Sequence, residues 1–247
     1  MVISEGMAEV LRSLRLSGVN GVAQASVRAL GAEGVALSLL VGASRMVEPL
    51  WCHPALSARF EELQFTLGEG PGHDAIRTGS PVLEPDLARV RPERWPALLP
   101  AARDMDVRGV CCFPLGIGAI RVGVLTVLCA PDRLPNDQQY ADAAALAAAL
   151  TVACLDEKRP DRRNSDTPDP GVTVPQTSSL HRAAVHQATG MVSVQLGVSM
   201  EVALLRLRAH AYAGGRPLGE VAQDVVARRL RFNDDMSGPN SPDGGKG

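Results

Sequence analysis

The stretch GVCCFPLGIGAIRVGVLTVLCA, residues 109–130, decides the fold of the larger part of the chain. It holds two apolar runs, 109–118 and 120–130, with glycine in the turn between them. Runs of this length, joined by a short Gly-containing turn, predict adjacent antiparallel strands. GVALSLLVG at 34–42 and RMVEPLWCH at 45–53 predict a second hairpin for the same reason.

Helical patterns surround these two hairpins. The predicted helices are an amphipathic stretch from Ser4 to Leu30 that breaks near Gly18 to Gly21, helices at 57–64 and 93–104, and an alanine-rich helix that begins at Asn136 or Asp137 and ends near Lys158. Hairpins with helices before and after them predict an α+β fold, in which helices flank one antiparallel sheet, rather than a doubly wound parallel sheet.

Composition narrows the class of protein. The chain has 247 residues, of which 45% are hydrophobic and only 3% aromatic, so its core is expected to be aliphatic. The five cysteines show no CxxC spacing, which predicts buried thiols rather than a disulfide framework or a zinc site. No run approaches the roughly 20 apolar residues of a membrane span. The N-terminus lacks the order of a secretory signal, so we expect a cytoplasmic protein with no membrane partner.

A change of composition marks the domain boundary. Pro, Asp, Ser and Thr dominate residues 156–179, and such a segment buries too little surface to offset its chain entropy. The sequence therefore predicts four parts. They are an α+β domain at 1–158, a flexible linker at 159–179, a small three-helix bundle at 180–232 and a disordered tail at 233–247.

The C-terminal bundle is basic. A first helix over 180–196 ends at Gly197, and Ser199 can cap a second helix. The apolar stripe expected on the second helix is Val202, Leu205, Ala209 and Tyr212; the inward side expected for the third is Val221, Ala222, Val225 and Arg229. Residues 180–232 hold seven arginines against three acidic residues, a net charge of +4, whereas the rest of the chain carries −6. This asymmetry points to nucleic acid as a partner of the bundle.

The turn GEGPGHDAIRTGS, residues 68–80, is the first candidate site. Its glycines let the backbone approach a ligand, and a helix starting near Pro71 would direct free amides at an anion. Glu69, Gly70, His73 and Asp74 form the predicted ligand-binding set, and the alternative is a tight connection with capping residues. The turn lacks a third strong metal ligand at suitable spacing and the GxxxxGK pattern of a P-loop, so no metal or cofactor is predicted.

Arginines of the bundle form the second candidate site. Arg206, Arg208, Arg216, Arg228, Arg229 and Arg231 can contact phosphates, and Tyr212 can stack on an unpaired base. The alternatives are a solvated arginine face and a helix-turn-helix for DNA. No GxSxG, HExxH, paired-carboxylate or Cys/His arrangement is present, so we do not expect an enzyme.

Two families resemble these regions. AAVHQATGMVSVQLGVSMEVALLRLRAHAYAGGRPLGEVAQDVV, residues 183–226, resembles the ANTAR domain, an RNA-binding module of bacterial antitermination regulators. LGEGPGHDAIRTGSPVLEPDL at 67–87, RWPALL at 94–99 and FPLGIGAIRVGVLTVLCA at 113–130 resemble the GAF domains that precede ANTAR in actinobacterial regulators.

The resemblance implies a cytoplasmic homodimer that binds paired stem-loops in nascent RNA and prevents a terminator hairpin from forming. The RNA-facing set that it implies is Gln187, Thr189, Gly190, Arg208, Tyr212 and Arg216. Family members often have lysine before the motif glycine, where this chain has Thr189. For Gly190, we expect close packing of another helix ahead of close approach by RNA. The alternative function is a DNA-binding or protein-interaction regulator without RNA specificity.

The GAF resemblance implies a sensor of a small-molecule ligand or signal. Relatives often have cysteine after EGP, and Gly72 stands there in this chain, so thiol sensing at that position is not available. The helix over 136–158, together with the N-terminal helix, is the expected dimer surface, because its alanines allow close helix approach.

Overall fold

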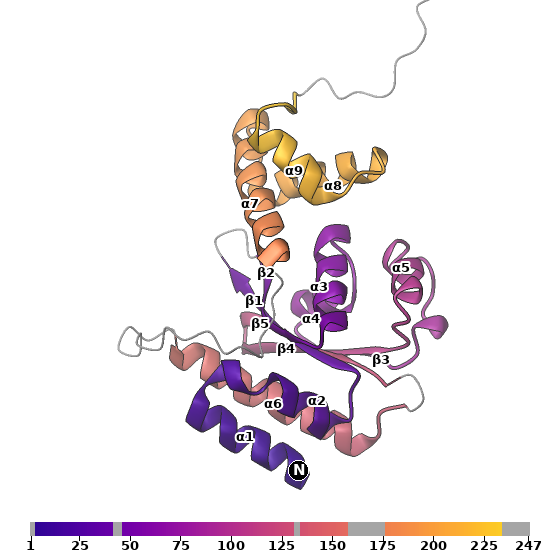
Figure 1. Ribbon diagram of the computed structural model, residues 1–247, viewed down its shortest axis with the longest axis vertical. Helices are drawn as coiled ribbons and strands as arrows, with labels where there is room; N and C mark the ends of the chain where they lie inside the picture. Colours follow the sequence, from indigo (N-terminus) through magenta and orange to yellow (C-terminus); the bar gives the residue numbers. More distant parts are fainter. Residues whose placement is uncertain (1–2, 42–45, 131–133, 158–175, 234–247) are drawn as a thin grey trace, which may run out of the picture. The chain divides into compact units, whose positions relative to one another are not determined.

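The chain divides into two compact units, residues 1–178 and 179–247. The computed structural model describes residues 3–41, 46–130, 134–157 and 176–233, and each unit is taken by itself (Figure 1). Most of the predicted linker at 159–179 and nearly all of the predicted tail at 233–247 lie outside the described residues. The predicted fold class, α+β with an antiparallel sheet flanked by helices, is confirmed.

One antiparallel sheet organises the described part of the first unit. Its order is β2-β1-β5-β4-β3. The strands are β1 Gly34–Val41, β2 Met46–His53, β3 Val82–Glu84, β4 Val110–Ile117 and β5 Ile120–Leu128. Both predicted hairpins are confirmed, and β1 pairs with β5 through registers such as Leu37 with Leu125. The short strand β3 was not predicted, because three residues are too few to show an alternating pattern.

Helices cover both faces of this sheet (Figure 1). One face carries α1 Glu5–Ser17, α2 Ala23–Leu30 and α6 Asp137–Glu157; the other carries α3 Ala55–Leu67, α4 Pro71–Thr78 and α5 Leu98–Asp104. Single 3-10 turns, Val19–Gly21 and Leu87–Arg89, precede α2 and follow β3. Each face has its own apolar core, and adjacent strand residues alternate between the two. Thus Cys111 belongs to the core with α1 and α6, whereas Cys112 belongs to the core with α5.

Polar caps fix the ends of the helices on the first face. Ser4 caps α1 by accepting from the Met7 amide at 3.2 Å, and its own amide and hydroxyl donate to buried Asp142 of α6 at 3.0 and 2.5 Å. Asn136 and Gln139 exchange side-chain to backbone hydrogen bonds of 2.9 Å at the start of α6, which is a capping box. The predicted cap of the alanine-rich helix is therefore confirmed.

The C-terminal unit contains α7 Gln176–Leu196, α8 Met200–Ala213 and α9 Leu218–Val226 within the described residues. Ser199 caps α8 as predicted, and Gly197 ends α7 with a φ of 62°. The first helix begins earlier than predicted, inside the stretch assigned to the linker, because its first turn is polar and carries no apolar stripe.

The apolar stripe expected on the second helix is not its buried side, and one residue expected on the inward side of the third helix is exposed. The buried side of α8 consists of Ala203, Leu204, Leu207 and Ala211, and the expected apolar stripe lies at the surface. Leu205 is 63% exposed and Tyr212 78%. Arg229 follows the end of α9 and is exposed, whereas Val221, Ala222 and Val225 are buried as predicted. The helix α8 carries small and apolar residues on two faces, so periodicity alone does not select the inner one.

All five cysteines are free and buried, as predicted. Among the described residues, no single helix is long and apolar enough to cross a membrane; α7 from Arg182 and α8 pass that test only as a pair, bent by 106°.

Candidate functional site

The predicted ligand-binding residues all line one cleft. The turn between α3 and α4 places Glu69 and Gly70, and the first turn of α4 places His73 and Asp74, around a cleft of about 390 Å³. Leu40 and Val47 supply apolar lining from the β1–β2 hairpin, and Trp95 supplies an aromatic wall. Gly70 has a φ of 131°, which only glycine adopts without strain, so the turn needs this residue. The cleft has the size and mixed lining of a small-molecule site.

Ion pairs hold the charged side chains of the cleft. The Asp74 carboxylate accepts from Arg77 at 2.9 Å and from Arg94 at 3.3 Å, and Arg94 also pairs with Glu84. The Arg94 guanidinium lies 4.3 Å from the centre of the Trp95 ring, in a cation–π contact. Two arginines therefore balance the negative charge of Asp74, and the charged side chains at the polar edge of the cleft are held in ion pairs.

Glu69 has a structural role in addition to lining the cleft. Its Oε1 accepts hydrogen bonds from the Ala97 and Leu98 amides, at 2.8 and 2.7 Å, at the start of α5. These amides have no partner within the helix, so Glu69 caps α5 from a distant part of the sequence. The alternative interpretation of this turn, a tight connection with helix-capping residues, therefore applies to Glu69.

Replacing Glu69 by alanine is expected to lower the unfolding free energy by about 1–3 kcal/mol, because two helix-end amides lose a charged acceptor. Chemical denaturation measures the change. Glu69→Gln keeps an amide oxygen at the same place and should recover part of the loss. An alanine variant as stable as the wild type would show that the cap contributes nothing.

A buried polar network beneath the turn was not predicted. Ser38 of β1 donates its hydroxyl to Glu61 Oε2 at 2.6 Å, and the Gln64 amide donates to Glu61 Oε1 at 3.1 Å. Gln64 Oε1 in turn accepts from the Gly72 amide at 2.8 Å, and the His73 ring bonds the Gln64 carbonyl at 3.0 Å. Glu61 and Gln64 are each only 4% exposed. The network ties the sheet to the cleft-forming turn.

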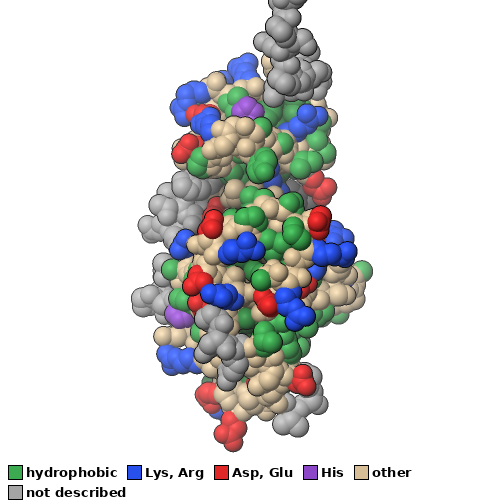
Figure 2. Space-filling model, turned by 90° about the vertical axis from the view of Figure 1, so that its right-hand side faces the viewer, with side chains coloured by type: hydrophobic (Ala, Val, Ile, Leu, Met, Phe, Trp, Pro, Cys, Tyr) green, Lys and Arg blue, Asp and Glu red, His purple; other side chains and the backbone are tan. Residues whose placement is uncertain are grey.

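The predicted RNA-facing residues of the C-terminal unit divide into exposed and buried ones. Tyr212 projects from α8, and Gln187 is exposed on α7. A methyl group added at Gly190 would meet no atom within 4 Å, so packing of a neighbouring helix does not explain this glycine, and the expectation that favoured packing is wrong. Figure 2 shows arginine and apolar side chains interspersed on one face of this unit.

Thr189 does not belong to the exposed set. Its side chain is fully buried, and its hydroxyl donates to the Val185 carbonyl within α7 at 2.7 Å. The prediction that it faces RNA is therefore corrected, because the residue points into the bundle. A phosphate contact from this position is not available in this chain.

The two predicted arginines are held in different ways. Arg208 is half-buried, and burial lowers its pKa to about 10, so it remains charged at neutral pH. Arg216 pairs with Asp224 at 2.7 Å, and Arg229 pairs with the same carboxylate at 2.7 Å. Hydrogen bonds from Arg216 and Arg229 lower the pKa of Asp224. An RNA phosphate at Arg216 would compete with this carboxylate.

Within the ranges that the structure describes, no group of three His, Cys, Asp or Glu side chains is placed to bind a metal ion.

Comparison with known families assigns the C-terminal unit. Residues 176–226 match the family model of the ANTAR domain. No curated protein sequence matches the chain.

Solved structures similar to the chain include GAF domains. One is the GAF domain of a phosphoenolpyruvate-protein phosphotransferase from Coxiella burnetii, at 16% identity and a TM-score of 0.46, covering 62% of this chain and 96% of that one. The nlh2 GAF domain of A. aeolicus has 13% identity and a TM-score of 0.45, with 62% and 95% covered. Free methionine-R-sulfoxide reductase from Neisseria meningitidis, with its substrate, has 17% identity and a TM-score of 0.43, with 61% and 87% covered.

The family match and the described helices coincide, since α7, α8 and α9 span the matched residues. The chain therefore carries an ANTAR domain at residues 176–226, preceded by an α+β domain whose structural neighbours include GAF domains.

Proposed function

We propose that the chain is a cytoplasmic RNA-binding regulator of transcription antitermination. In this proposal the ANTAR domain binds paired stem-loops in nascent RNA, and the α+β domain senses a small ligand in its cleft. The observation that carries the proposal is the ANTAR match over residues 176–226. The resemblance to this family implies RNA binding, because the ANTAR domain is an RNA-binding module of bacterial antitermination regulators.

The exposed side chains of the ANTAR domain suit unpaired bases. Proteins read RNA mainly in loops, where splayed bases stack on aromatic rings and arginines contact phosphates. Tyr212 offers a ring that is 78% exposed, and Arg206 is exposed on the same helix. Gln187 and the open backbone at Gly190 add a polar contact and a place for close approach on α7.

A homodimer would strengthen this binding. Two linked sites that each take one loop gain from a high effective concentration, which raises affinity without any new contact. The expected dimer surface on α1 and α6 has exposed apolar side chains, Leu16 at 81% and Val152 at 55%. Sedimentation of the full chain tests the dimer directly.

The alternative is a protein-interaction regulator, and the exposed stripe of α8 favours it. Val202, Leu205 and Tyr212 place apolar surface in water, as at many protein interfaces. DNA binding is a third possible function. One set of binding measurements distinguishes RNA binding, protein interaction and DNA binding.

The test uses transcripts that crosslink to the chain in cells. From these, an RNA with two hairpins is compared by fluorescence anisotropy with an RNA of the same stems and altered loops, and with duplex DNA. The proposal predicts the tightest binding to the unaltered RNA. Equal affinity for both RNAs, preference for DNA, or no nucleic-acid binding would contradict it.

Gly190→Ala is expected to stabilise the ANTAR domain by about 0.5–1 kcal/mol, because the glycine lies inside a helix and the added methyl group meets open space. The same methyl group should weaken RNA binding several-fold if the RNA backbone approaches there. Denaturation and anisotropy measure the two effects.

Gly21→Ala, in the 3-10 turn Val19–Gly21 and outside α1 and α6, is the control, since its methyl group would make an ordinary 3.5 Å contact with Ser17. It should leave RNA binding unchanged. Unaltered RNA affinity in Gly190→Ala would remove this glycine from the binding surface.

A further inference from the structure

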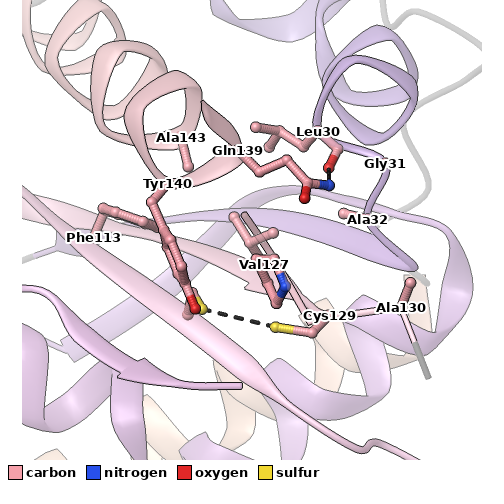
Figure 3. A pocket seen from close by; sticks show the side chains of 12 residues that line it. Leu30, Gly31, Ala32, Phe113, Val127, Cys129, Ala130, Gln139, Tyr140 and Ala143 are labelled. Atoms are coloured by element: carbon pink, nitrogen blue, oxygen red, sulfur yellow. Dashed lines mark hydrogen bonds between the residues drawn. The ribbon is translucent and has the colours of Figure 1, made fainter. Parts of the chain in front are cut away.

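Two thiols meet beneath α6, on the face of the sheet opposite the ligand cleft. Cys111 lies on β4, and Cys129 directly follows β5. Their sulfur atoms are 3.7 Å apart (Figure 3). Both side chains are nearly fully buried, with exposed fractions of 2% and 3%.

The sheet register explains why these two thiols meet. Cys111 pairs with Val127, and the Cys129 amide donates to the Gly109 carbonyl at 2.9 Å, so the two cysteines are diagonal neighbours on adjacent strands. Diagonal neighbours of an antiparallel pair point to the same face and are close enough for side-chain contact. Cys112, one residue along β4, points to the other face and contacts the Thr126 hydroxyl instead.

A small cavity adjoins the pair. It measures about 20 Å³ and is lined by both cysteines and by Tyr140 and Ala143 of α6 (Figure 3). That volume admits a water-sized molecule and excludes bulky reagents. Forming a disulfide bond requires the sulfur atoms to move from 3.7 Å to roughly 2.05 Å.

We propose that Cys111 and Cys129 form a reversible dithiol–disulfide site that a small hydroperoxide oxidises. Sulfur of Cys111 attacks one peroxide oxygen, the O–O bond breaks, and water leaves as the thiol becomes a sulfenic acid. The Cys129 thiol then attacks that sulfur, the S–O bond breaks, and a second water carries away the remaining proton. Two thiols are oxidised, one hydrogen peroxide is reduced, and the products are one disulfide and two waters.

The surroundings assign different roles to the two thiols. A hydrogen bond from Cys129 lowers the pKa of Cys111, and a smaller contribution from the Tyr140 hydroxyl acts in the same direction against desolvation, which raises it. That same hydrogen bond, with burial, raises the pKa of Cys129. Burial also raises the pKa of Tyr140 to about 12, so its hydroxyl remains a donor at neutral pH. We therefore assign Cys111 as the attacking thiol and Cys129 as the resolving thiol, because the Tyr140 hydroxyl bonds Cys111 and thiolates are the reactive form.

The test treats the full chain with hydrogen peroxide under non-denaturing conditions and maps the peptides without reduction. The expected result is the loss of two of the five thiols, a link between peptides 109–121 and 122–133, and recovery of both thiols with dithiothreitol. A bulky aromatic disulfide reagent should react with the folded chain far more slowly than peroxide does. Five intact thiols after peroxide treatment, or links only between chains, would overturn the proposal.

Variants assign the link within the first peptide, which holds both Cys111 and Cys112. Cys112→Ser is the matched control and should form the link as the wild type does, whereas Cys111→Ser and Cys129→Ser should not. In Cys129→Ser, peroxide should leave a sulfenic acid at Cys111 that dimedone traps. A link that disappears in Cys112→Ser and persists in Cys111→Ser would also overturn the assignment. The wild-type peptide map decides the proposal even where a variant fails to fold.

Discussion

A chain with alanine at Tyr212 is expected to bind the two-hairpin RNA about 5- to 150-fold more weakly than the wild type, because one stacked base contributes about 1–3 kcal/mol. The ring is 78% exposed on α8, so it is available to a base without rearrangement of the bundle. Anisotropy titrations at one fixed salt concentration measure the change, since phosphate contacts make RNA affinity depend on salt.

Two controls separate stacking from a general defect. Tyr212→Phe retains the ring and should bind RNA nearly as the wild type does. The alanine variant should unfold within about 0.5 kcal/mol of the wild type, as is usual for an exposed position. Wild-type RNA affinity in Tyr212→Ala would show that the exposed ring serves another partner, which is the outcome that the protein-interaction alternative predicts.

The sheet could be predicted because its strands are long and apolar and end at turns that contain glycine. Residues 109–118 and 120–130 became β4 and β5 with small changes at their ends. The inner face of α8 could not be predicted in the same way. Leu204 and Leu207 are buried while Val202 and Leu205 are exposed, although all four are apolar. Only the packing of the other helices distinguishes these two faces.

The candidate cleft could be predicted in part because its residues are contiguous. Glu69, Gly70, His73 and Asp74 follow one another along a single glycine-rich turn, so a local pattern was enough to find them. Their roles depended on distant residues, as with the α5 amides that Glu69 caps. The buried Glu61 and Gln64 were missed because polar residues on a helix usually face water. The one feature that indicated their burial was their position on the same side of α3 as Phe60 and Phe65.

Replacing Gln64 by leucine is expected to lower the unfolding free energy of the α+β domain by about 2–5 kcal/mol, because it leaves a buried amide and a buried carboxylate oxygen without partners. The amide is that of Gly72 and the oxygen is Oε1 of Glu61. Denaturant unfolding followed by tryptophan fluorescence measures the loss. Arg59→Ala, on the exposed side of the same helix, is the control and should change stability by less than about 0.5 kcal/mol.

A double variant tests whether these side chains act as one network. Leucine at both Glu61 and Gln64 removes the buried carboxylate together with its donor, so neither the unpaired carboxylate oxygen of Gln64→Leu nor the unpaired Gln64 amide of Glu61→Leu remains. The loss in the double variant should therefore be smaller than the sum of the losses in Glu61→Leu and Gln64→Leu. Additive losses would show that Gln64 supports the turn at Gly72 independently of the carboxylate. In that case the sheet and the cleft would be joined by separate contacts, and a change in the cleft would have no polar path through Glu61 to β1.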